Sequence, residues 1–146
     1  MSLNQPVVME PRQVVRALRI IWAVILISQF LYMATATRIH AVTIFPLEQR
    51  LQMIIAMMGV ATAAIVLGLR YVRIAGLISP PDPIDAQTRA KRALTTYIAC
   101  YVLCESISLY GFVVAFLRGA PKFYVPLYLG GVLLMILCYP RLPSEE

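Results

Sequence analysis

The sequence ALTTYIACYVLCESISLYGFVVAFL, Ala93–Leu117, decides the fold class of this chain. It contains one charged residue, Glu105, and lies between Arg92 and Arg118. At a rise of about 1.5 Å per residue, a helix of this length crosses a hydrocarbon core of about 30 Å. The stretch therefore predicts a membrane-spanning helix with a single acid near its midpoint.

The composition of the whole chain agrees with this prediction. Its 146 residues are 60% hydrophobic and 14% charged, which is typical of membrane proteins rather than soluble domains. The formal net charge is +6, but the basic residues flank apolar segments and so suit lipid headgroups. We therefore expect contact with a lipid bilayer and no binding of nucleic acid.

Three further apolar segments accompany the first one. The sequence predicts helices at about 14–37, 50–70, 86–118 and 123–139, with a proline-rich connection at 79–85. The short turn at 119–122 implies that the last two helices are antiparallel. We expect one domain, 1–146, of the all-α class: an integral membrane four-helix bundle with up-down-up-down topology.

The distribution of basic residues predicts the orientation of this bundle. Three lie at the N-terminal end of the chain (Arg12, Arg16 and Arg19), five lie in the 70–92 connection and one is in the tail, whereas four lie on the opposite side. Lys and Arg concentrate on the cytoplasmic side of membrane proteins. We therefore expect both termini to be cytoplasmic, in a bacterial inner membrane.

Glu105 is the main candidate for function. An ionisable group near the bilayer midplane costs at least about 2.5 kcal/mol, which makes it a functional-site hypothesis. Desolvation penalises its charged form, so we expect a protonated carboxyl unless a cation or several donors meet it. Two interpretations stay open: an ion-binding group, or a hydrogen-bonded group that only fixes helix register. The candidate partners of Glu105 are Gln29, Tyr101 and Ser108.

The segment Glu105–Ala115 resembles the ion-binding helix of the c subunit (proteolipid) of F-type ATP synthases. In that family a glutamate is followed five residues later by Tyr-Gly and then by aliphatic and small residues. Here Tyr110-Gly111 occupies these positions, followed by Phe112, Val113, Val114 and Ala115. The resemblance implies that Glu105 carries a proton or a sodium ion, with Tyr110 beside it.

Other parts of the chain depart from that family. The acid lies on the third predicted span rather than on the second helix of a hairpin, and the glycine repeat of the family's inner helix is missing. The overall layout resembles small bacterial four-helix membrane proteins of unassigned function. Small multidrug transporters also have four spans and one embedded glutamate, but theirs lies on the first span.

Catalytic and metal sites are not expected. The single histidine, His40, allows no Ser-His-Asp set, and no phosphate-binding loop is present. The three cysteines, Cys100, Cys104 and Cys138, lie in apolar segments without zinc-site spacing, and we expect them to act as small hydrophobic residues. We predict no enzyme activity and no cofactor.

Glycines at helical spacing allow helices to approach closely. The predicted packing positions are Gly59, Gly68, Gly111, Gly130 and Gly131. We expect the protein to be an accessory or structural subunit that packs against a larger membrane complex or forms a homo-oligomer. The alternative is a proton- or cation-handling protein that works through Glu105.

Overall fold

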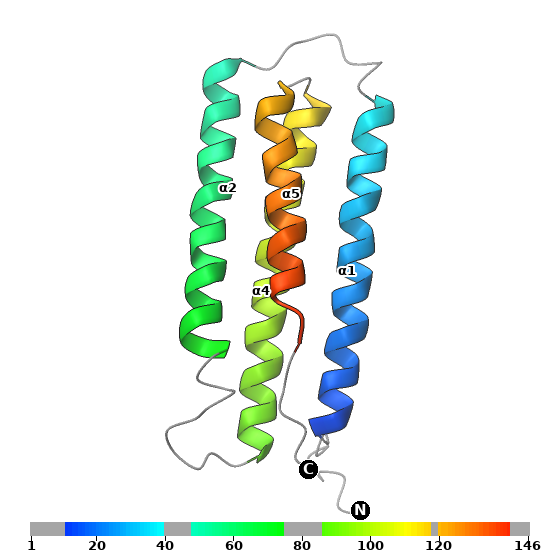
Figure 1. Cartoon of the computed structure of the whole chain (residues 1–146), viewed down its shortest axis with the longest axis vertical. Helices are drawn as coiled ribbons and strands as arrows, with labels where there is room; N and C mark the ends of the chain where they lie inside the picture. The colour runs from blue at the N-terminus through cyan, green and yellow to red at the C-terminus, as the bar shows by residue number, and fades with distance from the viewer. Residues whose placement is uncertain (1–10, 40–47, 75–85, 118–119, 141–146) are drawn as a thin grey trace, which may run out of the picture.

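The computed structural model describes residues 11–39, 48–74, 86–117 and 120–140. They form the helices α1 (Pro11–Ile39), α2 (Gln49–Leu69), α4 (Ala86–Phe116) and α5 (Pro121–Leu137), and a π-helical segment, η1 (Arg70–Ile74), continues α2 (Figure 1). No strand occurs in these ranges, which confirms the predicted all-α class. His40 and the connection 79–85 lie outside the described residues.

Two prolines set the limits of α5. The helix begins at Pro121, two residues before the predicted start, because the fixed φ of proline suits the first helical position. It ends at Leu137, with Cys138 as the C-cap, because Pro140 cannot continue the hydrogen-bonding pattern. This 17-residue helix is at the short limit for crossing a bilayer.

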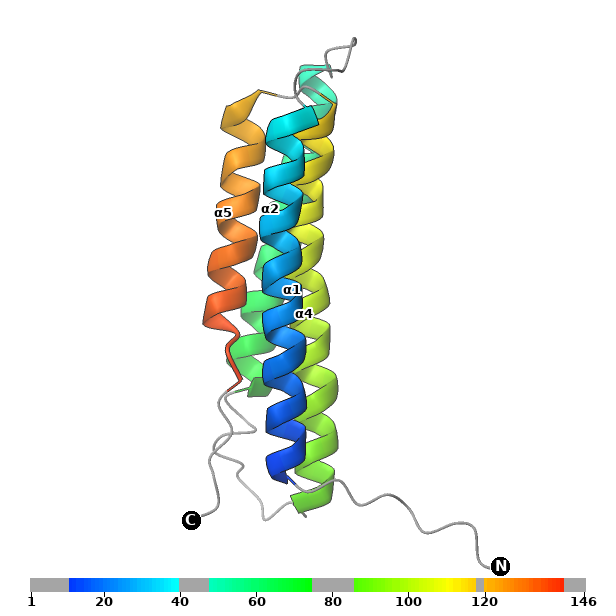
Figure 2. The same cartoon turned by 90° about the vertical axis from the view of Figure 1, so that its right-hand side faces the viewer.

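Helix α4 is the centre of the arrangement and contacts all the other helices. Helices α1 and α2 lie on opposite sides of the α4/α5 pair, as Figures 1 and 2 show from two directions. Within the described residues α1 and α2 make no contact with each other. The α4/α5 pair is therefore the core against which both N-terminal helices pack.

Two glycines bring α4 and α5 together. A methyl group on Gly111 would lie 3.1 Å from the carbonyl oxygen of Tyr124 on α5. A methyl group on Gly131 would lie 3.1 Å from the carbonyl oxygen of Cys104 on α4. Since each glycine faces the backbone of the other helix, a side chain at either position would push the helices apart.

Side chains from α1 and η1 cap the C-terminal end of α5. The last carbonyls of a helix have no partner within the helix. The indole nitrogen of Trp22 donates a hydrogen bond of 2.8 Å to the carbonyl oxygen of Met135, and Arg70 donates to that of Leu137. At the other end of α5, the side-chain oxygen of Gln52 accepts a 2.9 Å hydrogen bond from the amide of Ala120. These bonds fix the position of α5 along its axis relative to α1 and α2.

The outer faces of the helices are apolar. Helices α1, α2 and α4 are long and apolar enough to cross a membrane, and large exposed hydrophobic side chains lie along α1 and α2. Soluble monomers rarely expose apolar patches of more than a few hundred Å². The structure is therefore consistent with a membrane protein.

Candidate functional site

Glu105 lies at the contact between α4 and α1. Its Oε1 atom accepts hydrogen bonds from the hydroxyl of Ser28, at 3.1 Å, and from the hydroxyl of Tyr32, at 2.9 Å. Ser28 and Tyr32 are four residues apart, so they lie on one face of α1. Both donors come from the same helix, and the cluster therefore links α1 to α4.

Neither donor was among the predicted partners of Glu105. Ser28 and Tyr32 are four residues apart, so two hydrogen-bond donors on one helix face can reach the same carboxyl. This spacing is the signal in the sequence that could have identified them. The position of Tyr32 close to the predicted helix end at residue 37 is typical of an aromatic residue at the membrane interface. The helix instead extends to Ile39, so Tyr32 lies two turns inside it.

Gln29 is not hydrogen-bonded to Glu105, in contrast to the prediction. Its side chain is 1% exposed, and neither its amide nitrogen nor its amide oxygen has a partner within the described residues. Successive residues of an α-helix are rotated by about 100° about its axis. Because Ser28 faces Glu105 on α4, Gln29 points away from this contact and toward the interior.

Tyr101 and Ser108 also lie in the interior and not beside the carboxyl oxygens. Both side chains are fully buried, and neither hydroxyl has a hydrogen-bond partner in the described part of the chain. Ser108 faces α5 at Gly131. Trp22 meets α5 at Met135, and Ala36 packs near Tyr128, which places Gln29 between these levels. Gln29 and Ser108 are therefore two buried polar side chains without a hydrogen-bond partner among the described residues.

Tyr110 belongs to a different contact. A methyl group on Gly59 would lie 3.9 Å from the Cδ2 atom of Tyr110, so this ring faces α2. Five residues of α-helix turn the chain through about 500°, which puts Tyr110 on another side of α4 from Glu105. The structure thus separates two residues that the resemblance to the c subunit would place side by side.

The carboxyl of Glu105 is only partly buried. The exposed large side chains of α4 are Ile98, Val102, Leu109, Val113 and Phe116. Their spacing of three or four residues, with Glu105 between Val102 and Leu109, defines one stripe along the helix, called here the α4 stripe. The described residues donate hydrogen bonds only to Oε1, so Oε2 is left without a donor from them.

The predicted packing glycines divide into two groups. Gly59 faces Leu127, and Gly111 and Gly131 lie in the α4/α5 contact. Gly68 and Gly130 have no atom within 4 Å of an added methyl group, so they lie at the outer surface. Any close approach at these two positions would therefore need a second molecule.

The three cysteines meet at one place in the core. Cys100 and Cys104 on α4 and Cys138 at the end of α5 belong to the same buried core cluster, and all three are free. No group of His, Cys, Asp or Glu within the described ranges could hold a metal ion. Burial in the apolar core suits thiols acting as small hydrophobic side chains.

Comparison with known proteins adds no relative. No protein-family model, no curated protein and no solved structure matches this chain. The fold and the Glu105 cluster define the class only: a small all-helical protein with three helices of membrane-spanning length.

Proposed function

We propose that this protein is an accessory subunit of a larger membrane complex in a bacterial inner membrane. Its four spans run in up-down-up-down order, and both termini lie in the cytoplasm. The length and apolarity of α1, α2 and α4 support membrane insertion. The excess of basic residues in the N-terminal part of α1 and in the 70–92 connection supports the orientation. The contacts of α5 with Trp22 and Arg70 at one end and with Gln52 at the other support the order of the spans.

One observation carries the accessory role. Glu105 is partly exposed in the middle of the α4 stripe, and its Oε2 atom has no donor among the described residues. Lipid chains offer no hydrogen bonds, and a polar group facing them costs free energy. A helix of another membrane protein, or of a second copy, would cover the stripe and donate a hydrogen bond to Oε2. Gly68 and Gly130 offer further positions of close approach.

Photo-crosslinking in the native membrane tests this role. A photoreactive residue at Val102 or Leu109 flanks Glu105 on the α4 stripe, and one at Met57 on the exposed face of α2 serves as the control. We expect one discrete crosslinked protein product from the stripe positions and none from Met57. Glu105→Ala should abolish it, whereas Glu105→Gln, which keeps hydrogen-bonding atoms, should retain most of it. Equal crosslinking at all positions, or only to lipid, contradicts the proposal.

Proton or cation handling is the second candidate, and the hydroxyl of Ser28 favours it. Besides its contact with Glu105, this hydroxyl lies 2.7 Å from the carbonyl oxygen of Ile25. A serine hydroxyl has one proton to donate. With Glu105 ionised, Ser28 donates to Oε1; with Oε1 protonated, the carboxyl donates to Ser28, which then donates to Ile25. The same atoms thus accommodate both protonation states of the carboxyl.

Flux measurements separate the two candidates. Purified protein in vesicles with an imposed pH gradient is compared with Glu105→Gln and with the exposed control Tyr71→Phe. Proton handling requires a flux in the wild type and the control that Glu105→Gln abolishes. An absence of flux in all three, or a flux that Glu105→Gln leaves unchanged, removes this candidate and leaves the accessory role.

A further inference from the structure

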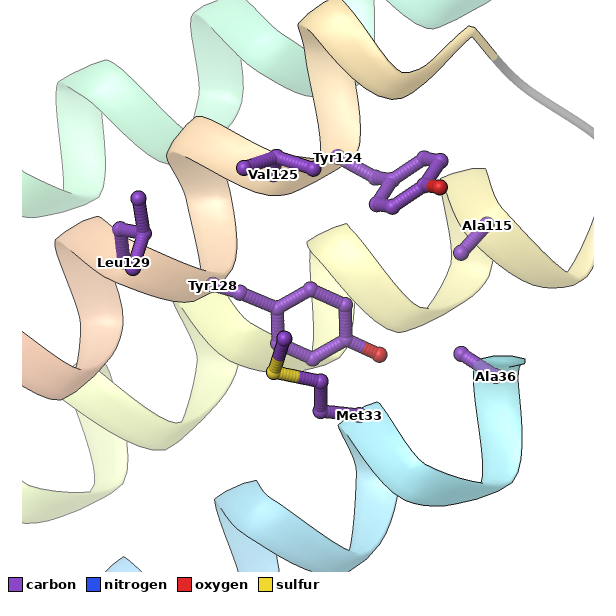
Figure 3. Close-up of a pocket in the computed structure, with 7 residues that line it drawn as sticks. All are labelled: Met33, Ala36, Ala115, Tyr124, Val125, Tyr128 and Leu129. Carbon is purple, nitrogen blue, oxygen red and sulfur yellow. The ribbon is translucent and has the colours of Figure 1, made fainter. Parts of the chain in front are cut away.

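A hollow away from Glu105 lies where α1, α4 and α5 meet (Figure 3). Its volume is about 210 Å³. An apolar cavity of about 150 Å³ is enough to hold a benzene-sized molecule, so this one can hold part of an acyl chain. Its walls include Met33, Ala36, Ala115, Val125, Tyr128 and Leu129.

Two tyrosines, Tyr124 and Tyr128, line this hollow, and the hydroxyl of Tyr128 is its buried polar group without a partner among the described residues. Tyr128 is 3% exposed, and its hydroxyl has no hydrogen-bond partner in the described ranges. Figure 3 shows the hydroxyl directed toward Ala36 and Ala115, which cannot accept or donate through their side chains. Because a buried hydroxyl without a partner is unfavourable, the geometry favours an occupant with one hydrogen-bond acceptor among apolar groups.

Positive charge lies at one end of the hollow. Lys122 precedes Val125 by three residues and Leu129 by seven, so the three share a face of α5. Lys122 is exposed in the first turn of α5, with its ammonium group 5.2 Å from the ring centre of Phe123. Charge, hydroxyl and apolar wall thus follow one another along the helix.

We propose that this hollow binds one anionic glycerophospholipid of the surrounding bilayer. The phosphate meets Lys122, an ester carbonyl oxygen accepts a hydrogen bond from Tyr128, and an acyl chain lies between Met33 and Leu129. This occupant matches the order of the groups: an anion at the start of α5, an acceptor one to two turns deeper, and hydrocarbon beyond. A second protein helix would leave the ammonium group of Lys122 without an anion.

Native mass spectrometry of the purified full chain tests the site. The protein is equilibrated in micelles with phosphatidylglycerol or phosphatidylcholine of identical acyl chains, and the lipid retained on the protein is counted. We expect one retained phosphatidylglycerol, held at least about tenfold more strongly than phosphatidylcholine. Tyr128→Phe should weaken retention about two- to tenfold, as expected for one lost hydrogen bond. Lys122→Gln should reduce the preference between the two lipids.

Matched controls identify the hollow as the site. Tyr71→Phe and Lys91→Gln make the same changes at exposed positions elsewhere and should retain wild-type binding. Ala115→Leu, which fills the hollow, should abolish retention; Tyr128→Phe keeps the result interpretable if that variant does not fold. Equal retention of the two lipids, or wild-type retention by both Tyr128→Phe and Lys122→Gln, overturns the proposal. Since the isolated chain is measured, the result is independent of any partner at the α4 stripe.

Discussion

The hydroxyl of Tyr32 donates a 2.9 Å hydrogen bond to Oε1 of Glu105, which lies 73 residues further along the chain. This bond joins α1 to α4 at the one acid of the central helix. It also limits what Glu105 can do, because any movement of its carboxyl must first break contacts with α1. Five measurable consequences of the structure follow from this and other contacts.

Removing the donors of Glu105 should loosen α1. Tyr32→Phe and Ser28→Ala each delete one hydrogen bond, and hydrogen bonds between membrane helices average about 0.6 kcal/mol. We expect each variant to lower the free energy of unfolding by about 0.5–1.5 kcal/mol in a denaturing-detergent titration. Combined with Glu105→Gln, the losses should not add, because the substitutions act on one cluster. Additive losses would show that the cluster does not couple the helices.

The adjacent glycines of α5 should respond in opposite ways. In Gly131→Ala the new methyl group meets the backbone of α4 at Cys104 and Ser108, so we expect a loss of about 1–3 kcal/mol. In Gly130→Ala the methyl group has no neighbour within 4 Å, and the higher helix propensity of alanine should leave stability equal or up to about 1 kcal/mol higher. Thermal unfolding in the same detergent compares the two, and equal effects would contradict the α4/α5 contact.

The end of α5 should fray when its caps are removed. Trp22→Phe and Arg70→Met each leave one terminal carbonyl, of Met135 or Leu137, without its donor. Hydrogen exchange should accelerate at the amides of Cys138 and Tyr139, which close the last turn. Exchange near Gln52, at the opposite end of the molecule, serves as the internal control. Unchanged exchange at Cys138 would mean that these contacts do not hold the helix end.

The cysteines should be shielded from reagents. Cys100, Cys104 and Cys138 are free and at most 1% exposed, so a membrane-permeant maleimide should label none of them in the folded protein. After denaturation it should add three labels, as counted by intact-mass spectrometry. Labelling of the native protein would place at least one thiol outside the core.

The orientation can be measured with reporter fusions. A fluorescent protein that matures only in the cytoplasm should be bright when joined after Glu146, and a periplasmic phosphatase at the same position should be inactive. Replacing Arg89, Lys91 and Arg92 by glutamine removes part of the cytoplasmic positive charge and should produce a mixed population. An active phosphatase on the unmodified chain would contradict the orientation.

Hydropathy and prolines predicted the helices well, because span length and helix ends are local properties of the sequence. The partners of Glu105 are not local: they depend on how far α1 rotates about its axis against α4. A rotation of about 100° exchanges Ser28 for Gln29 as the residue facing the acid, and apolar periodicity alone was too weak to fix this angle. The same limit explains Tyr110, whose direction is set by its packing near Gly59 on α2.

The absence of contact between α1 and α2 has a consequence for synthesis. A nascent chain that ends before Ala86 contains two apolar helices with no native surface in common. Their relative positions are defined only after the ribosome has synthesised α4 and α5. A stop codon just before the codon of Ala86 would therefore leave two apolar helices without their packing partners, a form that quality-control proteases remove.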